Sequence, residues 1–205
     1  MKKQLLFLLT MLAVLVVSGE AKSFTFKDNF EDGNTKGWMF VSDDERSSDP
    51  ASCWKVENGR LLESCPWDAQ LALVANRSFT SHTFKTQVEV LGSAGVVLWY
   101  RDLNNYVAIG MYGGGSAIYV NEACDGITYS SIYGHDNYQS GTLDMEVKAD
   151  SVNGKFDFYF GGQYAFTHTV QTSERKGLSG LAGGNNGGYF DNFSISSISD
   201  GKNKK

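Results

Sequence analysis

An acidic side chain stands in an apolar row near the C-terminal end of the chain. The stretch at 187–196, GGYFDNFSIS, alternates like a β-strand and places Asp191 on one face together with Tyr189, Phe193 and Ile195. Burial of a carboxylate costs several kcal/mol unless a partner compensates its charge. We therefore expect Asp191 either to bind a calcium ion or to accept hydrogen bonds from nearby backbone N–H groups.

A second set of candidate residues lies in the middle of the chain, in GVVLWYRDLNNYVAIGMYGGGSAIYV at 95–120. The alternation predicts a three-strand meander with one aliphatic face, and an opposite face that carries Trp99, Arg101, Tyr106, Tyr112 and Tyr119. Aromatic rings stack on the apolar faces of sugar rings, while neighbouring polar groups bind the hydroxyls. We predict that these residues bind a polysaccharide or glycan. The alternative is that the same rings pack beneath a second layer.

The sequence gives little sign of catalysis. Asp144 and Glu146 in LDMEV point to the same side of a strand, where they could resemble the carboxylate pair of a glycosidase, but Lys148 shares that side as on an ordinary solvated strand. The histidines are scattered, and the sequence has neither a His-Glu-x-x-His nor a Cys-x-x-Cys metal motif. It also lacks a Gly-x-Ser-x-Gly nucleophile turn. The residues favour a binding protein over an enzyme.

Three cysteines occur in the chain, at Cys53, Cys65 and Cys124. The pair Asn58-Gly59 is typical of a two-residue hairpin turn. A hairpin folded about this pair brings Cys53 and Cys65 almost opposite each other on paired strands. We therefore predict a Cys53–Cys65 disulfide, which leaves Cys124 either buried or free.

Period-two alternation dominates the elements that must position these residues. It is clear in FKTQVEV at 84–90, TLDMEVKA at 142–149 and KFDFYF at 155–160, and Asn-Gly and Gly-Gly turns flank the last of these. No stretch shows a helical face over three turns. Many short strands with frequent turns predict an all-β antiparallel sandwich or barrel.

The ends of the chain differ from this body. Two lysines precede an apolar run over 5–17 and small residues follow, which is typical of a secretory signal peptide over 1–21. The alternative, an uncleaved anchor, needs about 20 apolar residues. We expect one domain over 22–198, a polar basic tail over 199–205 and no transmembrane segment in the mature chain. The protein would then be secreted, either extracellular or periplasmic, and its net charge of −5 argues against nucleic acid as a partner.

Four stretches, taken in order, resemble the concanavalin A-like lectin/glucanase superfamily, especially its laminin G-like and carbohydrate-binding jelly rolls. They are FKDNFEDGNTKGW, WKVENGRLL, GVVLWYRDLNNYVAIGMY and KGLSGLAGGNNGGYFDNFSIS, within about 24–198. The resemblance implies a jelly-roll sandwich whose first and last strands lie side by side, often joined by a structural calcium ion. It would place Asp28 or Glu31 beside Asp191 as oxygen ligands. The stretch NFEDGNTKGW is also similar to calcium-bearing jelly rolls of the galactose-binding type, which is the alternative topology.

A second acidic segment, SDDERSSDP at 42–50, could hold the metal instead, although its spacing is not that of an EF-hand and suits a solvated loop. Taken together, these features predict a secreted, non-catalytic, lectin-like module that binds carbohydrate and carries a structural calcium ion. Two alternatives stay open. One is a glycoside hydrolase-like enzyme of the same superfamily, and the other is a protein-binding or adhesion module.

Overall fold

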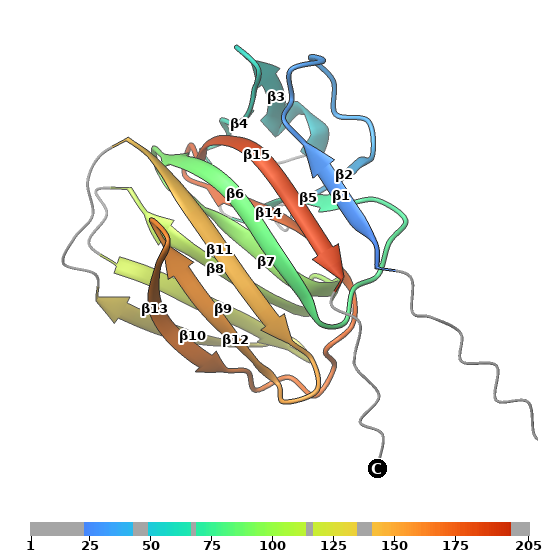
Figure 1. The fold of residues 1–205 in the computed structure, drawn as a ribbon, viewed down its shortest axis with the longest axis vertical. Coiled ribbons are helices and arrows are strands. Elements are labelled where there is room, and N and C mark those ends of the chain that lie inside the picture. Colours follow the sequence, from blue (N-terminus) through green and yellow to red (C-terminus); the bar gives the residue numbers. More distant parts are fainter. Residues whose placement is uncertain (1–22, 43–48, 67–68, 114–116, 135–140, 198–205) are drawn as a thin grey trace, which may run out of the picture.

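The computed structural model of this protein describes residues 23–42, 49–66, 69–113, 117–134 and 141–197. The predicted signal peptide over 1–21, the tail over 199–205 and the acidic residues at 43–48 lie outside the described residues. The described chain forms two antiparallel sheets, which we name sheet A and sheet B, stacked face to face as a sandwich (Figure 1). The predicted all-β antiparallel jelly-roll sandwich is confirmed.

Sheet A lies in front in Figure 1 and carries the first and last strands of the fold. Its spatial order is β13 (Gln163–Thr169), β12 (Lys155–Phe160), β11 (Thr142–Asp150), β6 (His82–Val90), β15 (Gly188–Ser197), β4 (Arg60–Glu63) and β3 (Trp54–Glu57). Strand β1 (Thr25–Asp28) also pairs with β15, with Phe26 opposite Ile195 and Asp28 opposite Phe193. The two ends of the domain are therefore neighbours, as the resemblance implied.

Sheet B forms the second layer and holds the central meander. Its spatial order is β10 (Ile127–Gly134), β9 (Ala117–Cys124), β8 (Asn105–Tyr112), β7 (Ser93–Asp102), β14 (Leu178–Gly184), β5 (Gln70–Val74) and β2 (Trp38–Ser42). The described residues contain one short helical turn, η1 (Pro50–Cys53), whose Asp49 cap accepts a hydrogen bond from the N–H of Ala51.

The core lies between the sheets and follows the alternation of the sequence. Phe84, Val147 and Phe158 of sheet A are fully or almost fully buried, as are Val96 and Ile109 of sheet B. Strand β12 alternates strictly between buried and half-buried residues, because its side chains point in turn to the core and to solvent. Each large apolar side chain buried in this way contributes about 1.5–3 kcal/mol relative to exposure.

The hairpin of β3 and β4 forms as its turn residues predict. Asn58 and Gly59 both have positive φ, at 54° and 71°, which suits a two-residue turn of type I′. The fold places the α-carbons of Cys53 and Cys65 5.0 Å apart, and the two residues form a disulfide. The predicted pairing is confirmed, and Cys124 is a half-buried free thiol.

An irregularity in β7 places Trp99 on the face opposite to the one that the alternation predicts. The pairing of β7 with β8 shifts register after Leu98, and Trp99 itself has a φ of 52°, which is rare for a bulky residue. Leu98 and Trp99 therefore both enter the core, where the indole N–H of Trp99 donates to the carbonyl oxygen of Thr80 at 2.8 Å. The predicted place of Trp99 on the ligand face is wrong, because a one-residue insertion exchanges the two faces of a strand.

A second register shift corrects the predicted surroundings of Asp191. Pairing between β15 and β6 shifts between Asp191 and Ser194, and Asn192 has a φ of 49°. Phe190 and Phe193 consequently both point into the core, although they lie three residues apart. Asp191 is half-buried outside that apolar row, and its Oδ1 atom accepts a hydrogen bond from the N–H of Asn192 at 2.6 Å. The expectation that Asp191 shares a buried face with Phe193 is wrong.

Candidate functional site

The outward face of sheet B is hollowed along a row of very small residues. Ala182 of β14 lies opposite Gly95 of β7, which lies opposite Gly110 of β8. Larger side chains resume at both ends of this row, with Leu71 beside Ala182 and Tyr119 beside Gly110. A groove of about 310 Å³ lies on this face, and we name it the tyrosine groove; it is lined by Ala69, Leu71, Ser93, Tyr106, Ala108, Tyr112, Tyr119, Asn121, Thr128, Ala182, Gly183, Gly184 and Asn185.

Three tyrosines line the groove, and they differ in exposure. Tyr119 is 6% exposed, and its hydroxyl accepts a hydrogen bond from Ser93 Oγ at 3.0 Å. A Cβ atom at Gly110 would lie 2.5 Å from that hydroxyl, so Tyr119 lies directly over the glycine. Tyr112 is 42% exposed, with its ring centroid 4.8 Å from that of Tyr119. Tyr106 is half-buried and packs on Tyr100, so Tyr112 offers solvent the most accessible ring of the three.

Polar but uncharged groups complete the groove. Asn121 and Thr128 lie on its lining, as does Asn185 at the turn after β14. The Oδ1 atom of Asn121 accepts a hydrogen bond from Ser130 Oγ at 2.8 Å, which fixes the side-chain amide and turns its NH₂ group to other acceptors. Aromatic rings beside amide and hydroxyl groups are the usual composition of a sugar site.

The structure separates the five residues predicted to bind a ligand. Tyr106, Tyr112 and Tyr119 come together in the groove, whereas neither Trp99 nor Arg101 lines it. Trp99 is a core residue, and Arg101 is an exposed side chain in an ion pair with Glu174 at 3.3 Å. Arg101 therefore has no place in the groove that the structure describes.

Sequence reasoning missed several other lining residues. Asn121 follows Tyr119 by two positions, so the alternation of β9 could have identified it. Ser93 belongs to β7, the first strand of the meander, and Thr128 to β10, the strand that follows it. Ala182 comes from β14, whose pairing with β7 no local pattern reveals.

The predicted calcium ligands have other partners in the structure. One carboxylate oxygen of Asp28 accepts the indole N–H of Trp38 at 2.7 Å, and the other accepts the N–H of Phe30 at 2.8 Å. Glu31 is exposed, and its carboxylate lies against the turn at Gly59. Together with Asp191, these carboxylates do not form a group whose ligand atoms all lie within 4.8 Å of one another. The three carboxylates therefore do not form one cluster, and calcium held by Asp191 with Asp28 or Glu31 stays a prediction.

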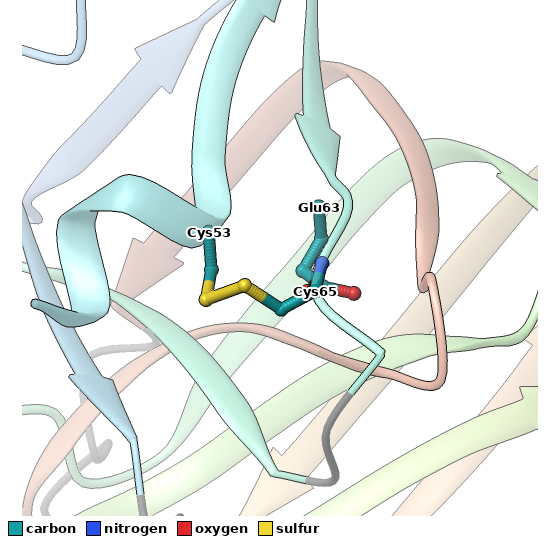
Figure 2. A group of neighbouring side chains, drawn as sticks. All are labelled: Cys53, Glu63 and Cys65. Atoms are coloured by element: carbon teal, nitrogen blue, oxygen red, sulfur yellow. Dashed lines mark hydrogen bonds between the residues drawn. A yellow bond between two sulfur atoms is a disulfide. The ribbon is translucent and has the colours of Figure 1, made fainter. Parts of the chain in front are cut away.

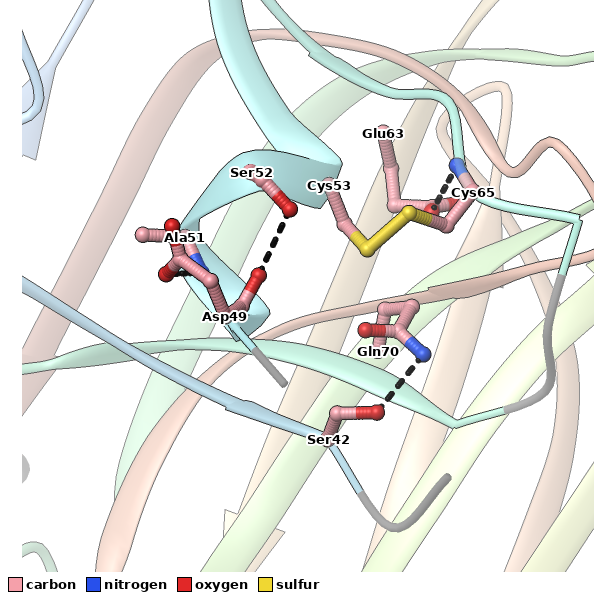
Figure 3. Close-up of a disulfide and its surroundings, with 8 residues drawn as sticks. All are labelled: Ser42, Asp49, Ala51, Ser52, Cys53, Glu63, Cys65 and Gln70. Carbon is pink, nitrogen blue, oxygen red and sulfur yellow. Dashed lines mark hydrogen bonds between the residues drawn. A yellow bond between two sulfur atoms is a disulfide. The ribbon is translucent and has the colours of Figure 1, made fainter. Parts of the chain in front are cut away.

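One such group does occur in the described chain, at the disulfide (Figure 2). It consists of Cys53, Glu63 and Cys65, but both sulfur atoms are already bonded to each other. Glu63 is fully buried; its Oε1 atom accepts the N–H of Cys65 at 2.7 Å, while Oε2 has no hydrogen-bond partner. Burial raises the pKa of Glu63 to about 7, against the lowering effect of the Cys65 N–H. Figure 3 also shows Gln70 nearby, whose amide donates to Ser42 Oγ at 2.9 Å.

The remaining carboxylates of interest lie away from the groove. Asp144 accepts a hydrogen bond from Gln87, and Glu146 pairs with Lys85 and Lys148 on the outward face of sheet A. Buried Glu122 accepts from His168 at 2.7 Å, and its other oxygen accepts from the N–H of Gln171. None of the carboxylates in the described chain lines the tyrosine groove.

Comparison with solved structures identifies the fold. No family model matches the sequence, and no curated protein matches it. The carbohydrate-binding module CBM66 from Bacillus subtilis superposes with a TM-score of 0.63 at 14% identity, over 78% of this chain and 96% of the module. The module and this chain share the two-sheet antiparallel sandwich fold.

Two further solved structures share this fold and represent different activities. An endo-β-1,3-glucanase from Pyrococcus furiosus has a TM-score of 0.60 at 10% identity, over 84% of this chain and 93% of the enzyme. The winged bean acidic lectin, in complex with methyl-α-D-galactose, has a TM-score of 0.58 at 12% identity, over 85% of this chain and 98% of the lectin. Within the described ranges, no helix is long and apolar enough to cross a membrane.

Proposed function

We propose that this protein binds carbohydrate without cleaving it, and that the tyrosine groove is the binding site. The observation that carries the proposal is the exposed ring of Tyr112, which stands beside a floor of glycine and alanine and within reach of amide and hydroxyl groups. The carbohydrate-binding module and the lectin that share the fold support this reading.

Each part of the groove has a role in this proposal. A sugar ring would stack on Tyr112, because the apolar C–H face of a sugar complements an aromatic face. The ring of Tyr119 packs against that of Tyr112, and the hydrogen bond from Ser93 positions the hydroxyl of Tyr119. Asn121 and Thr128 would exchange hydrogen bonds with hydroxyl groups. Because sheet strands carry these groups, little side-chain entropy is lost on binding.

The glucanase among the structural neighbours raises hydrolysis as a second candidate function. Glycosidases usually need a carboxylic acid and a second carboxylate on either side of the scissile bond. The lining of the groove in the described residues contains neither Asp nor Glu. We therefore favour binding, and we expect no release of reducing sugar from a polysaccharide that the protein binds.

We also propose that the protein is exported. The Cys53–Cys65 disulfide suits an oxidising compartment, and the N-terminal residues have the composition of a signal peptide. Edman sequencing of the protein recovered from the culture medium or the periplasm should begin at about residue 22.

A glycan array tests the proposed function. The wild type should bind at least one class of glycan, and Tyr112→Ala should weaken that signal while keeping its melting temperature. An array on which the folded wild type binds nothing would contradict the proposal.

A further inference from the structure

We propose that the tyrosine groove selects neutral glycans and rejects those that carry carboxylate, sulfate or phosphate groups. This inference rests on the proposed function and adds a substrate class to it.

The lining of the groove is the first observation. Its described side chains are aromatic, aliphatic, hydroxyl or amide groups, and they include no Lys, Arg, Asp or Glu. Proteins that recognise carboxylate, sulfate or phosphate do so largely with charge-assisted hydrogen bonds, above all from arginine. An anionic sugar in this groove would lose hydration without gaining such a partner, and that loss is costly.

The positions of the cations on β4, β6, β7 and β11 are the second observation. Arg101, the cation that β7 supplies, is paired with Glu174 and does not line the groove. Lys85 and Lys148 lie on sheet A and share Glu146. Arg60 on β4 is likewise paired, with Glu89 at 2.7 Å. None of these cations lines the groove, so none of them offers an anionic ligand a partner there.

The third observation is a pair of carboxylates beyond one end of the groove. Tyr106 of β8 lies opposite Ala123 of β9, which lies opposite Thr128 of β10, and the chain turns through Asp125 two residues after Ala123. Two residues of strand span about 7 Å, which is within the Debye length of about 8 Å at physiological salt.

Asp102 strengthens this negative end. It lies opposite Asn105, the residue before Tyr106. Hydrogen bonds from Asn105 and from the N–H of Asn104 hold the pKa of Asp102 below its ordinary value, so this carboxylate stays ionised. Asp102 and Asp125 therefore place two negative charges near the Tyr106 end of the groove.

The test uses a matched pair of polysaccharides whose backbone is chosen from the array hits. One member is neutral, and in the other the C6 hydroxymethyl groups are oxidised to carboxylates. Dissociation constants are measured by affinity electrophoresis at low salt and at about 0.5 M salt, where the Debye length falls to a few ångströms. We expect the carboxylated polymer to bind at least tenfold more weakly at low salt. The difference should narrow at high salt, while the affinity for the neutral polymer stays constant.

Asp125→Asn sharpens the test. Asparagine tolerates the φ of 50° at this position, and the substitution removes one negative charge outside the groove. It should strengthen binding of the carboxylated polymer about twofold at low salt and leave the neutral polymer unaffected. Asp144→Asn on sheet A is the matched control and should change neither affinity.

The outcomes separate the two proposals. Equal or tighter binding of the carboxylated polymer would overturn the neutral-ligand inference while leaving carbohydrate binding intact. An array without hits, or hits whose signal Tyr112→Ala does not weaken, would instead overturn the proposed function of the groove and this inference with it.

Discussion

The outward faces of the two sheets show how one architecture can produce two different surfaces. On sheet A, Lys85 lies opposite Glu146, and Gln87 lies opposite Asp144, so that polar side chains pair across the strands. On sheet B, the equivalent central row is Ala182, Gly95 and Gly110, which offer almost no side chain. The outward face of sheet A therefore carries paired polar side chains, whereas the central row of sheet B carries almost none.

Shape alone does not distinguish these faces. Sheet A also carries a hollow, of about 390 Å³, with Lys85, Asp144 and Glu146 on its lining. Lys85 and Glu146 form an ion pair, Asp144 accepts a hydrogen bond from Gln87, and the ring of the neighbouring Tyr159 lies under the ammonium group of Lys148 at 4.1 Å. A ligand there would have to break these contacts. In the tyrosine groove, by contrast, the ring of Tyr112 packs on Tyr119 and is exposed to solvent.

The largest expected effect is a loss of stability on substitution of Trp99, and it tests on which side of sheet B this side chain lies. Because its indole is 1% exposed and hydrogen-bonded to Thr80, Trp99→Ala should cost about 3–5 kcal/mol in the free energy of unfolding. Tyr164→Ala on sheet A, at a ring that is 58% exposed, should change it by less than about 0.5 kcal/mol. Urea unfolding followed by circular dichroism measures both. If the Trp99→Ala protein is stable but fails to bind glycan, then Trp99 lies on the ligand face, as the alternation predicted, and not in the core.

The next largest effect concerns Glu63, which lies between the sheets. Its folded pKa of about 7 exceeds the ordinary value of 4.5, so the folded state holds the proton more tightly than the unfolded state. The resulting stability is complete below pH 4.5 and is lost as the pH rises through 7. A shift of this size corresponds to about 3 kcal/mol.

Glu63→Gln isolates this contribution. Burial lowers the pKa of His82 to about 4, so His82 acts in the opposite direction, and stability is lost as the pH falls from 6.5 through 4. Both proteins share His82, and the difference between wild type and Glu63→Gln therefore reports Glu63 alone. Between pH 5 and pH 8, the wild type should lose about 2–3 kcal/mol more than the variant. Parallel pH profiles would contradict the assignment.

Calcium is the prediction that the contacts of β1 and β15 support least. An ion that joined these strands would add about 2.7 kcal/mol at a hundredfold excess over its dissociation constant, and chelator would lower the melting temperature by several degrees. The hydrogen bonds of Asp28 and Asp191 instead predict an unchanged melting curve, and a cost below about 1 kcal/mol for Asp191→Asn. The positions of Asp28 and Asp191 favour an unchanged melting curve in chelator. A chelator-sensitive melt restored by calcium would reverse that preference.

The smallest expected effect belongs to the charged pairs of sheet A. The side chains of Lys85 and Glu146 are 59% and 24% exposed, so solvent and salt screen their attraction. Lys85→Ala should therefore change the free energy of unfolding by less than about 1 kcal/mol and leave glycan affinity unaltered. Isothermal titration would reveal any larger change in affinity, which would place part of the ligand on sheet A.

Alternation in the sequence was sufficient wherever the strands are regular. It predicted β6, β11 and β12, and the Asn58-Gly59 turn predicted the hairpin and its disulfide. It also placed Tyr106, Tyr112 and Tyr119 on one face, because β8 and β9 pair without a shift.

The errors occur where the pairing shifts register. At Trp99 and between Asp191 and Ser194, an irregular residue exchanges the two faces, and neither position has the glycine that would reveal a left-handed backbone. The contribution of β14 to the groove could not be predicted from local sequence patterns, because β14 pairs with β7 across a long stretch of chain.

The central claim is that a ring on sheet B, rather than one on sheet A, binds the glycan. Isothermal titration of an array-selected glycan into wild type, Tyr112→Ala, Tyr112→Phe and Tyr164→Ala tests it directly. Tyr112→Ala should weaken binding by about 1–3 kcal/mol, a factor of about 5 to 150, because a stacked ring is lost. Tyr112→Phe keeps the ring and should stay within about threefold of wild type, and Tyr164→Ala should be unchanged. Full affinity in Tyr112→Ala, or an equal loss in Tyr164→Ala, would contradict the account.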